Sequence, residues 1–332
     1  MGTEKAPAAL KRLKQFVGML AAAGVHTTTF TWEPEGVVYS TGKAVVRGNA
    51  TGRYVDAARL SQLPRSVHAD SVSEETLWRN LEQFVRDMEP VCRQHHVRML
   101  LHPNDPPLPS VCGLPCLMRT AGAFDRVFAA AADSPWIGME FCCGTWMEGL
   151  QYRPHTRQHE EQQRGGEGFE HKQHEKGAGR QETGGDAAQH TRQHQRCNAE
   201  DVARKRAKTG REQGMLPSTA EALDACGPGQ FGVGQEALLG ALADFVSRGK
   251  VGIVHLRNTT GPLPRFAETF VDDGYVDVFR IAQTLVRVGY TGTVILDHTP
   301  PFSGEAGERC ATSFSIGYIK ACIRAAQASG LP

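Results

Sequence analysis

Four residues with metal-binding side chains stand at the ends of short apolar runs. His102 closes RMLLH, Cys142 or Cys143 closes MEFCC, His255 closes GIVH and Asp297 closes VILD. A mixed set of nitrogen, sulfur and oxygen donors suits Mn²⁺, Fe²⁺, Zn²⁺ or Co²⁺ better than Mg²⁺ or Ca²⁺. Such a metal stabilises negative charge that develops on a substrate. Each residue alone is more often a structural side chain, so the hypothesis depends on their recurrence at strand ends.

The elements that carry these residues alternate along the chain. Apolar runs rich in β-branched and aromatic residues predict five strands, at 26–32, 97–102, 138–143, 252–257 and 293–298. Amphipathic spacing predicts helices between and around them, among them 8–24, 73–96 and 235–249. This alternation indicates an α/β protein of parallel β/α units. Because parallel strands end on one face of their sheet, the four metal-binding side chains are expected to converge there.

One long segment departs from this composition. Residues 151–214 contain only Tyr152, Phe169 and Val202 from the larger apolar types, and they hold six of the chain's histidines. A segment so poor in apolar surface cannot offset the entropy of ordering, so a disordered, low-complexity polar insert is predicted over 151–234. The flanking parts, 1–150 and 235–332, are then two halves of one catalytic domain.

Composition also limits the class of protein. The 37 basic and 36 acidic side chains nearly cancel, which argues against a nucleic-acid-binding surface. No apolar run is long enough to span a membrane, and the first residues lack the apolar core of a signal peptide. Nine scattered cysteines indicate free thiols in a reducing compartment. We therefore expect a cytoplasmic protein without a membrane partner; its oligomeric state stays open, a homo-oligomer included.

Several motifs together resemble one enzyme family, the bacterial D-mannonate dehydratases. They occur in the family's order and cover most of the chain outside 151–234. The motifs are LHPNDPP (101–107), GLP (113–115), FCCGTW (141–146), VHLRN (254–258), FAETFVDDGYVDVFR (266–280), LDHTP (296–300) and SFSIGY (313–318).

The resemblance implies a xylose-isomerase-like TIM barrel that removes water from D-mannonate to give 2-keto-3-deoxy-D-gluconate in glucuronate breakdown. It implies Mn²⁺ or Fe²⁺ as the metal, with Zn²⁺ or Co²⁺ as alternatives. The implied metal ligands are His102, Cys142, His255 and Asp297, which are the residues found at the strand ends. Cys142 is preferred over Cys143 because it stands two residues before Gly144, as in the family's C-x-G motif.

Dehydration also needs groups that move protons and hold the sugar acid. His298, next to Asp297, resembles the family's catalytic histidine. Arg257, Asn104 and Asp105 are candidates for contacts with the substrate carboxylate and hydroxyls, because a guanidinium binds a carboxylate in a bidentate manner.

The chain departs from the family pattern in two ways. Phe314 stands where the family has a catalytic tyrosine, and a phenyl ring has no hydroxyl for proton transfer. Five strands are predicted where a closed barrel has eight, so the chain is expected to lack about three β/α units at its amino-terminal end. Two alternatives therefore stay open: a metal-dependent sugar isomerase or epimerase of the same superfamily, and a barrel remnant without catalysis.

Overall fold

The computed structural model describes residues 4–33, 39–149 and 231–330. Most of the predicted insert, 151–234, lies outside the described residues. Where the chain is described again it is already helical, because α8 runs over Phe231–Ser247. The predicted start of this helix at residue 235 was therefore too late. Glycines at 232 and 234 hid the helix from sequence patterns, since glycine is a poor helix former.

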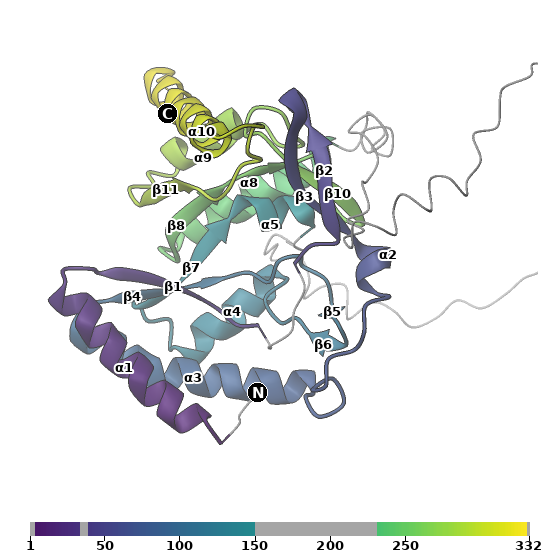
Figure 1. Cartoon of the computed structure of the whole chain (residues 1–332). Helices are drawn as coiled ribbons and strands as arrows, with labels where there is room; N and C mark the ends of the chain where they lie inside the picture. Colours follow the sequence, from purple (N-terminus) through teal and green to yellow (C-terminus); the bar gives the residue numbers. More distant parts are fainter. Residues whose placement is uncertain (1–3, 34–38, 150–230, 331–332) are drawn as a thin grey trace, which may run out of the picture. The chain divides into compact units, whose positions relative to one another are not determined.

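A five-stranded parallel sheet forms the centre of the described chain (Figure 1). Its strands are paired in the order β1-β4-β7-β8-β11, and every pairing is parallel. They are the five predicted strands, and their bounds are β1 Thr27–Thr31, β4 Arg98–His102, β7 Ile137–Cys142, β8 Val251–Leu256 and β11 Thr293–Leu296. The described sheet is a half-barrel, so the predicted α/β class with five strands is confirmed.

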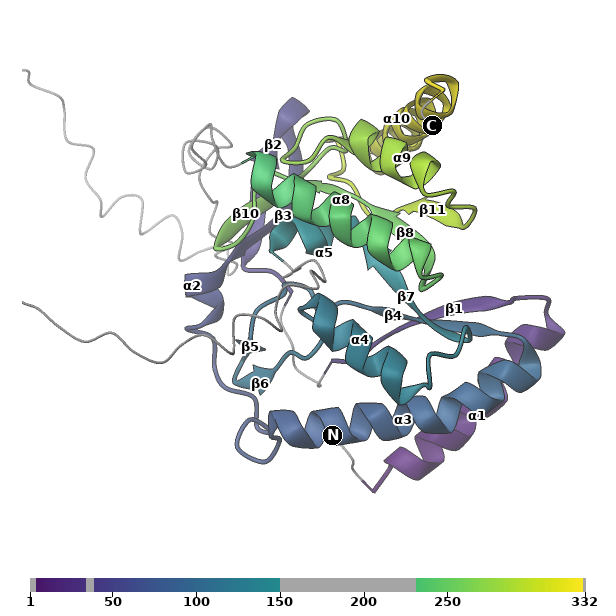
Figure 2. The ribbon, with the colours of Figure 1, turned by 180° about the vertical axis from the view of Figure 1, so that it is seen from behind.

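Helices cover one face of this sheet. Their bounds are α1 Ala6–Ala22, α3 Glu74–His95, α4 Ala121–Ala130, α9 Val278–Arg287 and α10 Gly307–Ala328, together with α8. Figure 2 shows α4 and α8 along the side of β7 and β8. The large core cluster joins Met139 and Phe141 of β7 to Val254 of β8 and to helix residues such as Phe245. Because strand side chains alternate, Glu140, Cys142 and His255 belong to the opposite face.

The sequence of α3 explains where this long helix begins and ends. Ser73 is its N-cap, and the Ser73 side chain accepts a hydrogen bond from the backbone N–H of Thr76. Its buried face carries Leu81, Val85 and other apolar residues at helical spacing. The helix stops at His96, which adopts a left-handed backbone conformation. None of the described helices is long and apolar enough to cross a membrane.

A second, antiparallel sheet was not predicted. It has the order β2-β3-β10-β9, with bounds β2 Gly42–Val46, β3 Ala50–Asp56, β10 Arg265–Thr269 and β9 Asn258–Thr259. Strand β9 follows β8 after one residue, so this sheet begins at the carboxyl end of the parallel sheet. The remaining short elements are η1 Arg47–Asn49, α2 Ala57–Leu60, β5 Ser110–Val111, β6 Leu114–Pro115 and α5 Cys143–Glu148. These segments mix polar and apolar residues without a clean period, which is why sequence patterns missed them.

Candidate metal centre

Three of the predicted donors meet at the carboxyl ends of adjacent strands. His102 ends β4, Cys142 ends β7 and His255 lies near the end of β8, and their ligand atoms lie within 4.8 Å of one another. Asp297, just after β11, adds a carboxylate. Its Oδ2 is 3.5 Å from Cys142 Sγ and its Oδ1 is 3.7 Å from His255 Nδ1. The structure thus brings the four side chains together as the strand-end pattern predicts.

The two imidazoles are oriented by other partners. His102 Nδ1 lies 2.7 Å from the carbonyl oxygen of Pro103, so this nitrogen carries a proton and Nε2 is left as the ligand atom. His255 Nε2 contacts the Glu140 carboxylate. His255 Nδ1 is buried and has no hydrogen-bond partner among the described residues. A carboxylate on one ring nitrogen, with the other nitrogen turned toward further donor atoms, is the usual arrangement of a metal-binding histidine.

The charges at the site favour a thiolate. Burial and the Asp297 carboxylate raise the pKa of the Cys142 thiol, but Arg257 and His102 outweigh them and lower this pKa to about 6. Burial lowers the pKa of the two histidines, whereas Cys142 and Glu140 raise it, to about 9 for His102 and about 10 for His255. Without a metal, these shifts favour a thiolate at Cys142 and protonated imidazoles at His102 and His255. A metal ion displaces those protons when it binds.

This donor set can hold a divalent metal ion. It combines two imidazoles, a thiolate and a carboxylate, and its unpartnered buried nitrogen is accounted for by a bound cation. Nitrogen and sulfur ligands suit a transition metal better than the oxygen-preferring Ca²⁺ and Mg²⁺.

His298 lies on the open side of the same cluster. Its Nδ1 is 2.9 Å from Glu268 Oε2, its Nε2 is 3.5 Å from Asp297 Oδ1, and its side chain is 48% exposed. Burial lowers the pKa of His298, but the hydrogen bond that its ring donates to Glu268 and the negative charge of Glu268 outweigh burial and raise this pKa. His298 is thus held by one carboxylate and remains accessible to a small molecule.

Two of the predicted substrate contacts are engaged inside the protein. Arg257 is 1% exposed, and it donates to Asp297, Glu148 and Asp105 at 2.9, 2.6 and 2.7 Å. Asp105 is bound a second time, by the guanidinium of Arg53. The structure therefore shows Arg257 and Asp105 as members of an ion cluster behind the metal-binding residues. Their direct contact with a substrate stays a prediction.

Asn104, the third predicted contact, is 2% exposed and also has internal partners. Its amide donates to the carbonyl of Trp32 and to Glu33, and its Oδ1 accepts from the backbone N–H of Met118 at 2.7 Å. These bonds hold the loop that follows β4, directly after His102, the last residue of the strand. The described contacts of Asn104 are therefore structural.

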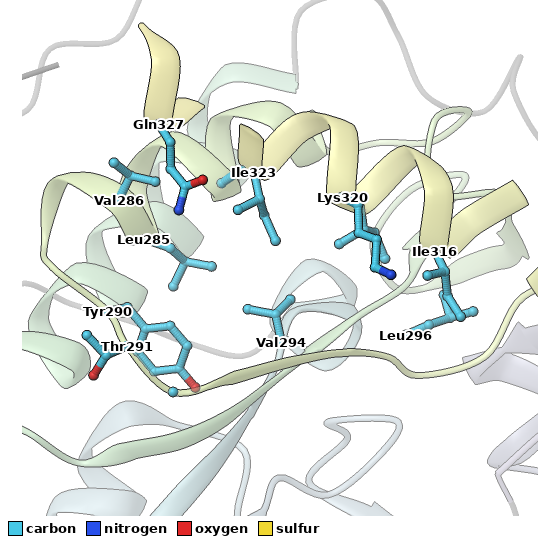
Figure 3. Close-up of a pocket in the computed structure, with 13 residues that line it drawn as sticks. Leu285, Val286, Tyr290, Thr291, Val294, Leu296, Ile316, Lys320, Ile323 and Gln327 are labelled. Carbon is cyan, nitrogen blue, oxygen red and sulfur yellow. The ribbon is translucent and has the colours of Figure 1, made fainter. Parts of the chain in front are cut away.

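A separate apolar pocket of about 380 Å³ lies between β11, α9 and α10 (Figure 3). Val294 and Leu296 of β11 line it together with Leu285 and Ile323. Because strand side chains alternate, these two residues point away from the face that carries Asp297. The pocket is therefore not the place for a polar sugar acid beside the metal-binding residues.

Comparison with known proteins agrees with the motifs. Residues 43–152 match the family model of D-mannonate dehydratase (UxuA). Over 88 residues the chain is 36% identical to a mannonate dehydratase of Shouchella clausii, in a segment that covers 26% of this chain and 24% of that protein. A mannonate dehydratase of Thermotoga maritima is 39% identical over 75 residues, which cover 23% of this chain and 20% of that protein. Over these segments the chain is similar to the D-mannonate dehydratases.

The matched segments span about a quarter of these mannonate dehydratases or less. The family match includes His102 and Cys142, whereas His255 and Asp297 lie beyond it. The fold extends the likeness further. The crystal structure of mannonate dehydratase from Streptococcus suis serotype 2 aligns with a TM-score of 0.63 at 18% identity, over 98% of this chain and 74% of that one. The predicted TIM-barrel-like architecture is thereby confirmed.

Phe314, at the position that the mannonate dehydratase resemblance assigns to a tyrosine, lies on α10. Its ring contacts Phe270 at 6.1 Å and Tyr318 at 6.5 Å between centroids, and the guanidinium of Arg47 lies 5.8 Å from its centre. These neighbours form an aromatic cluster with one cation. The described contacts of Phe314 thus include none of the four metal-binding residues.

Sequence reasoning missed four charged residues of the site: Arg53, Glu140, Glu148 and Glu268. Glu140 carried a usable signal, because it is a single acidic residue inside the apolar strand GMEFC, whereas Glu268 lies in RFAET, which mixes polar and apolar residues. A buried charge in such a run needs a partner. Arg53 and Glu148 carried no comparable signal, since neither lies in a regular apolar pattern.

Gly144 illustrates how closely the site is packed. A Cβ at this position would lie 2.3 Å from Arg257 Nε, within the space that the guanidinium occupies. We expect Gly144→Ala to lower the free energy of unfolding by about 1–3 kcal/mol, measured by urea denaturation. Gly122→Ala in α4 is the control, because nothing lies within 4 Å of its added methyl group. It should raise stability by up to about 1 kcal/mol. Equal effects of the two substitutions would contradict the packing argument.

Proposed function

We propose that this chain catalyses the metal-dependent dehydration of D-mannonate to 2-keto-3-deoxy-D-gluconate. The observation that supports this most is the convergence of His102, Cys142, His255 and Asp297 in a chain related to mannonate dehydratases. We further propose that these four residues bind Mn²⁺ or Fe²⁺. The reaction would belong to glucuronate breakdown in the cytoplasm.

The reaction removes a proton from C2 and a hydroxyl group from C3, which leave together as water. His298 is the proposed base for the C2 proton. Its Nε2 is the ring atom available to a substrate, because Nδ1 is held by Glu268. The Glu268 carboxylate stabilises the imidazolium that forms when the proton is taken. A bound divalent metal would supply Lewis acidity that stabilises negative charge on the substrate carboxylate beside C2.

We expect His298→Gln to lower the rate of 2-keto acid formation from D-mannonate by about 10²–10⁴-fold while metal content is unchanged. Glutamine keeps a polar side chain but cannot accept the C2 proton. The measurement is product formation by the metal-loaded protein, with metal content determined on the same samples. His26→Gln is the matched control, since His26 is exposed at the opposite end of the sheet, before β1.

The same assay separates the alternative functions. Metal-loaded wild-type protein that isomerises or epimerises a sugar, and gives no 2-keto acid from D-mannonate, would favour the isomerase or epimerase alternative. A wild-type chain that binds no divalent metal would favour the non-catalytic remnant. Equal rates for His298→Gln and wild type would remove His298 from the mechanism.

A further inference from the structure

A buried cluster of two guanidinium groups and several carboxyl groups lies behind the candidate metal centre. Its members come from segments that are far apart in the sequence. They are Arg53 on β3, Asp105 after β4, Glu148 at the end of α5, Arg257 after β8, Glu268 on β10 and Asp297 after β11.

The contacts form a continuous path from His298, the proposed base, to Asp297, a proposed metal ligand. Glu268 holds His298 Nδ1 through Oε2, and its Oε1 accepts from Arg53 Nε at 2.7 Å. Arg53 Nη2 donates to Glu148 Oε1 at 2.7 Å. The same oxygen accepts from Arg257 Nη1 at 2.6 Å, and Arg257 Nε donates to Asp297 Oδ2 at 2.9 Å.

Glu148 occupies the middle of this path. Its side chain is fully buried, and its Oε2 has no hydrogen-bond partner among the described residues. Burial raises the pKa of Glu148, and the Asp105 carboxylate adds to this against the opposing effect of Arg257. Two guanidinium groups thus share one oxygen of Glu148, and the role of this side chain is to accept both of their hydrogen bonds.

We propose that Arg53 and Glu148 are positioning residues of the candidate site. Together they hold the Asp297 carboxylate and the Glu268–His298 pair in place. Neither residue contacts His298 Nε2 or the ligand atoms of the four proposed metal-binding residues. This proposal rests on the proposed roles of Asp297 and His298.

Stability alone is a weak reason for such a cluster. Taking charges out of water costs several kcal/mol each, and apolar replacements of whole buried ion pairs are often neutral or stabilising. What apolar residues cannot supply is the fixed direction of each hydrogen bond. Arg53 in particular binds Glu268, Glu148 and Asp105 with one planar group, which a lysine cannot reproduce.

The test measures the affinity of the full chain for Co²⁺, followed by the visible absorption of the Co²⁺–thiolate complex. We expect Arg53→Met to weaken binding by about 10–100-fold, as loss of a supporting partner does at metal sites, and Arg53→Lys to restore only part of it. Glu148→Gln should bind within about threefold of wild type, because an amide oxygen can accept the same two hydrogen bonds. Glu148→Leu should resemble Arg53→Met.

Arg98→Met is the matched control for a merely structural effect. Arg98, like Arg53, is a partly buried arginine, but it lies on β4 of the parallel sheet and donates to the backbone carbonyls of Gly249 and Val251 at the amino ends of the strands. The Arg98→Met protein should be less stable than wild type but should keep the wild-type affinity for Co²⁺ and the wild-type absorption spectrum of the Co²⁺ complex. If Arg98→Met and Arg53→Met weaken Co²⁺ binding equally, or if Arg53→Met leaves affinity and spectrum unchanged, the proposal is overturned.

A second readout does not depend on metal. In a crystal structure of metal-free Arg53→Met or Arg53→Lys, the Asp297 carboxylate and the His298 ring should be displaced from their wild-type positions. Unmoved side chains would overturn the proposal. A wild-type chain that binds no Co²⁺ would instead contradict the proposed metal-dependent function, and the crystal structures would still decide the positioning role.

Discussion

Replacing His255 with alanine is expected to abolish metal binding. Wild-type protein purified without chelators should contain about one Mn, Fe, Zn or Co ion per chain, and His255→Ala should contain none above background. The buried Nδ1 of His255 has no hydrogen-bond partner among the described residues and lies 3.7 Å from the Asp297 carboxylate. Its loss removes one of the four proposed ligands and leaves Cys142 and Asp297 without the neighbouring imidazole.

Elemental analysis and calorimetric titration measure this directly. Cys142→Ala should have the same effect, whereas Glu140→Gln should only weaken binding, by about 10–100-fold, because Glu140 orients His255 without being one of the four proposed ligands. His26→Ala is the control for a histidine on the same sheet outside the site. Full metal content in His255→Ala would place the metal elsewhere and remove the main support for the proposed function.

The parallel sheet could be predicted because its signal is local. Each strand is a short apolar run that ends at a polar residue, as in RMLLH before Pro103, and helices of regular period separate the strands. Convergence of the donors then follows from parallel topology alone. The antiparallel sheet gave no such signal. Its strands β3 and β10 pair Val55 with Phe266 across more than two hundred residues, and no local period reveals that pairing.

The roles of some site residues could not be predicted, because these roles also depend on long-range contacts. His102 and His255 could be proposed as donors because metal-binding side chains recur at the ends of successive strands, although a single histidine there is more often structural. Arg257 could not be distinguished from a substrate-binding arginine, since its partners Glu148 and Asp105 come from separate parts of the chain. Whether a guanidinium faces a ligand or internal carboxyl groups depends on long-range contacts, which the sequence around it does not encode.

Arg257→Met is expected to lower the free energy of unfolding by about 3–5 kcal/mol at neutral pH, the usual cost of breaking a buried ion pair on one side. Arg257 is almost fully buried, and the substitution leaves Asp105 and Glu268 with Arg53 as their one remaining guanidinium partner in the cluster. Methionine fills a similar volume, so little of the loss would come from a cavity. The measurement is urea denaturation of both proteins.

The loss of unfolding free energy in Arg257→Met should become smaller as the pH falls. Burial favours the neutral form of Asp105, but Arg257 and Arg53 outweigh it and hold the pKa of this carboxyl well below its usual range. A carboxyl group with a depressed folded-state pKa stabilises the protein fully above its unfolded pKa of about 4, and this contribution is lost as the pH falls toward the folded value. Arg257→Met removes much of that depression, so the two proteins should approach each other in stability below about pH 4.

Arg98→Met again supplies the comparison. The carbonyl partners of Arg98 do not titrate, so its loss of stability should be nearly constant between neutral and acidic pH. If the difference in unfolding free energy between wild type and Arg257→Met stays constant on acidification, Arg257 does not act by stabilising ionised carboxylates. A difference that narrows only for Arg257→Met would identify the carboxylates around Arg257 as the reason this arginine is buried beside the metal-binding residues.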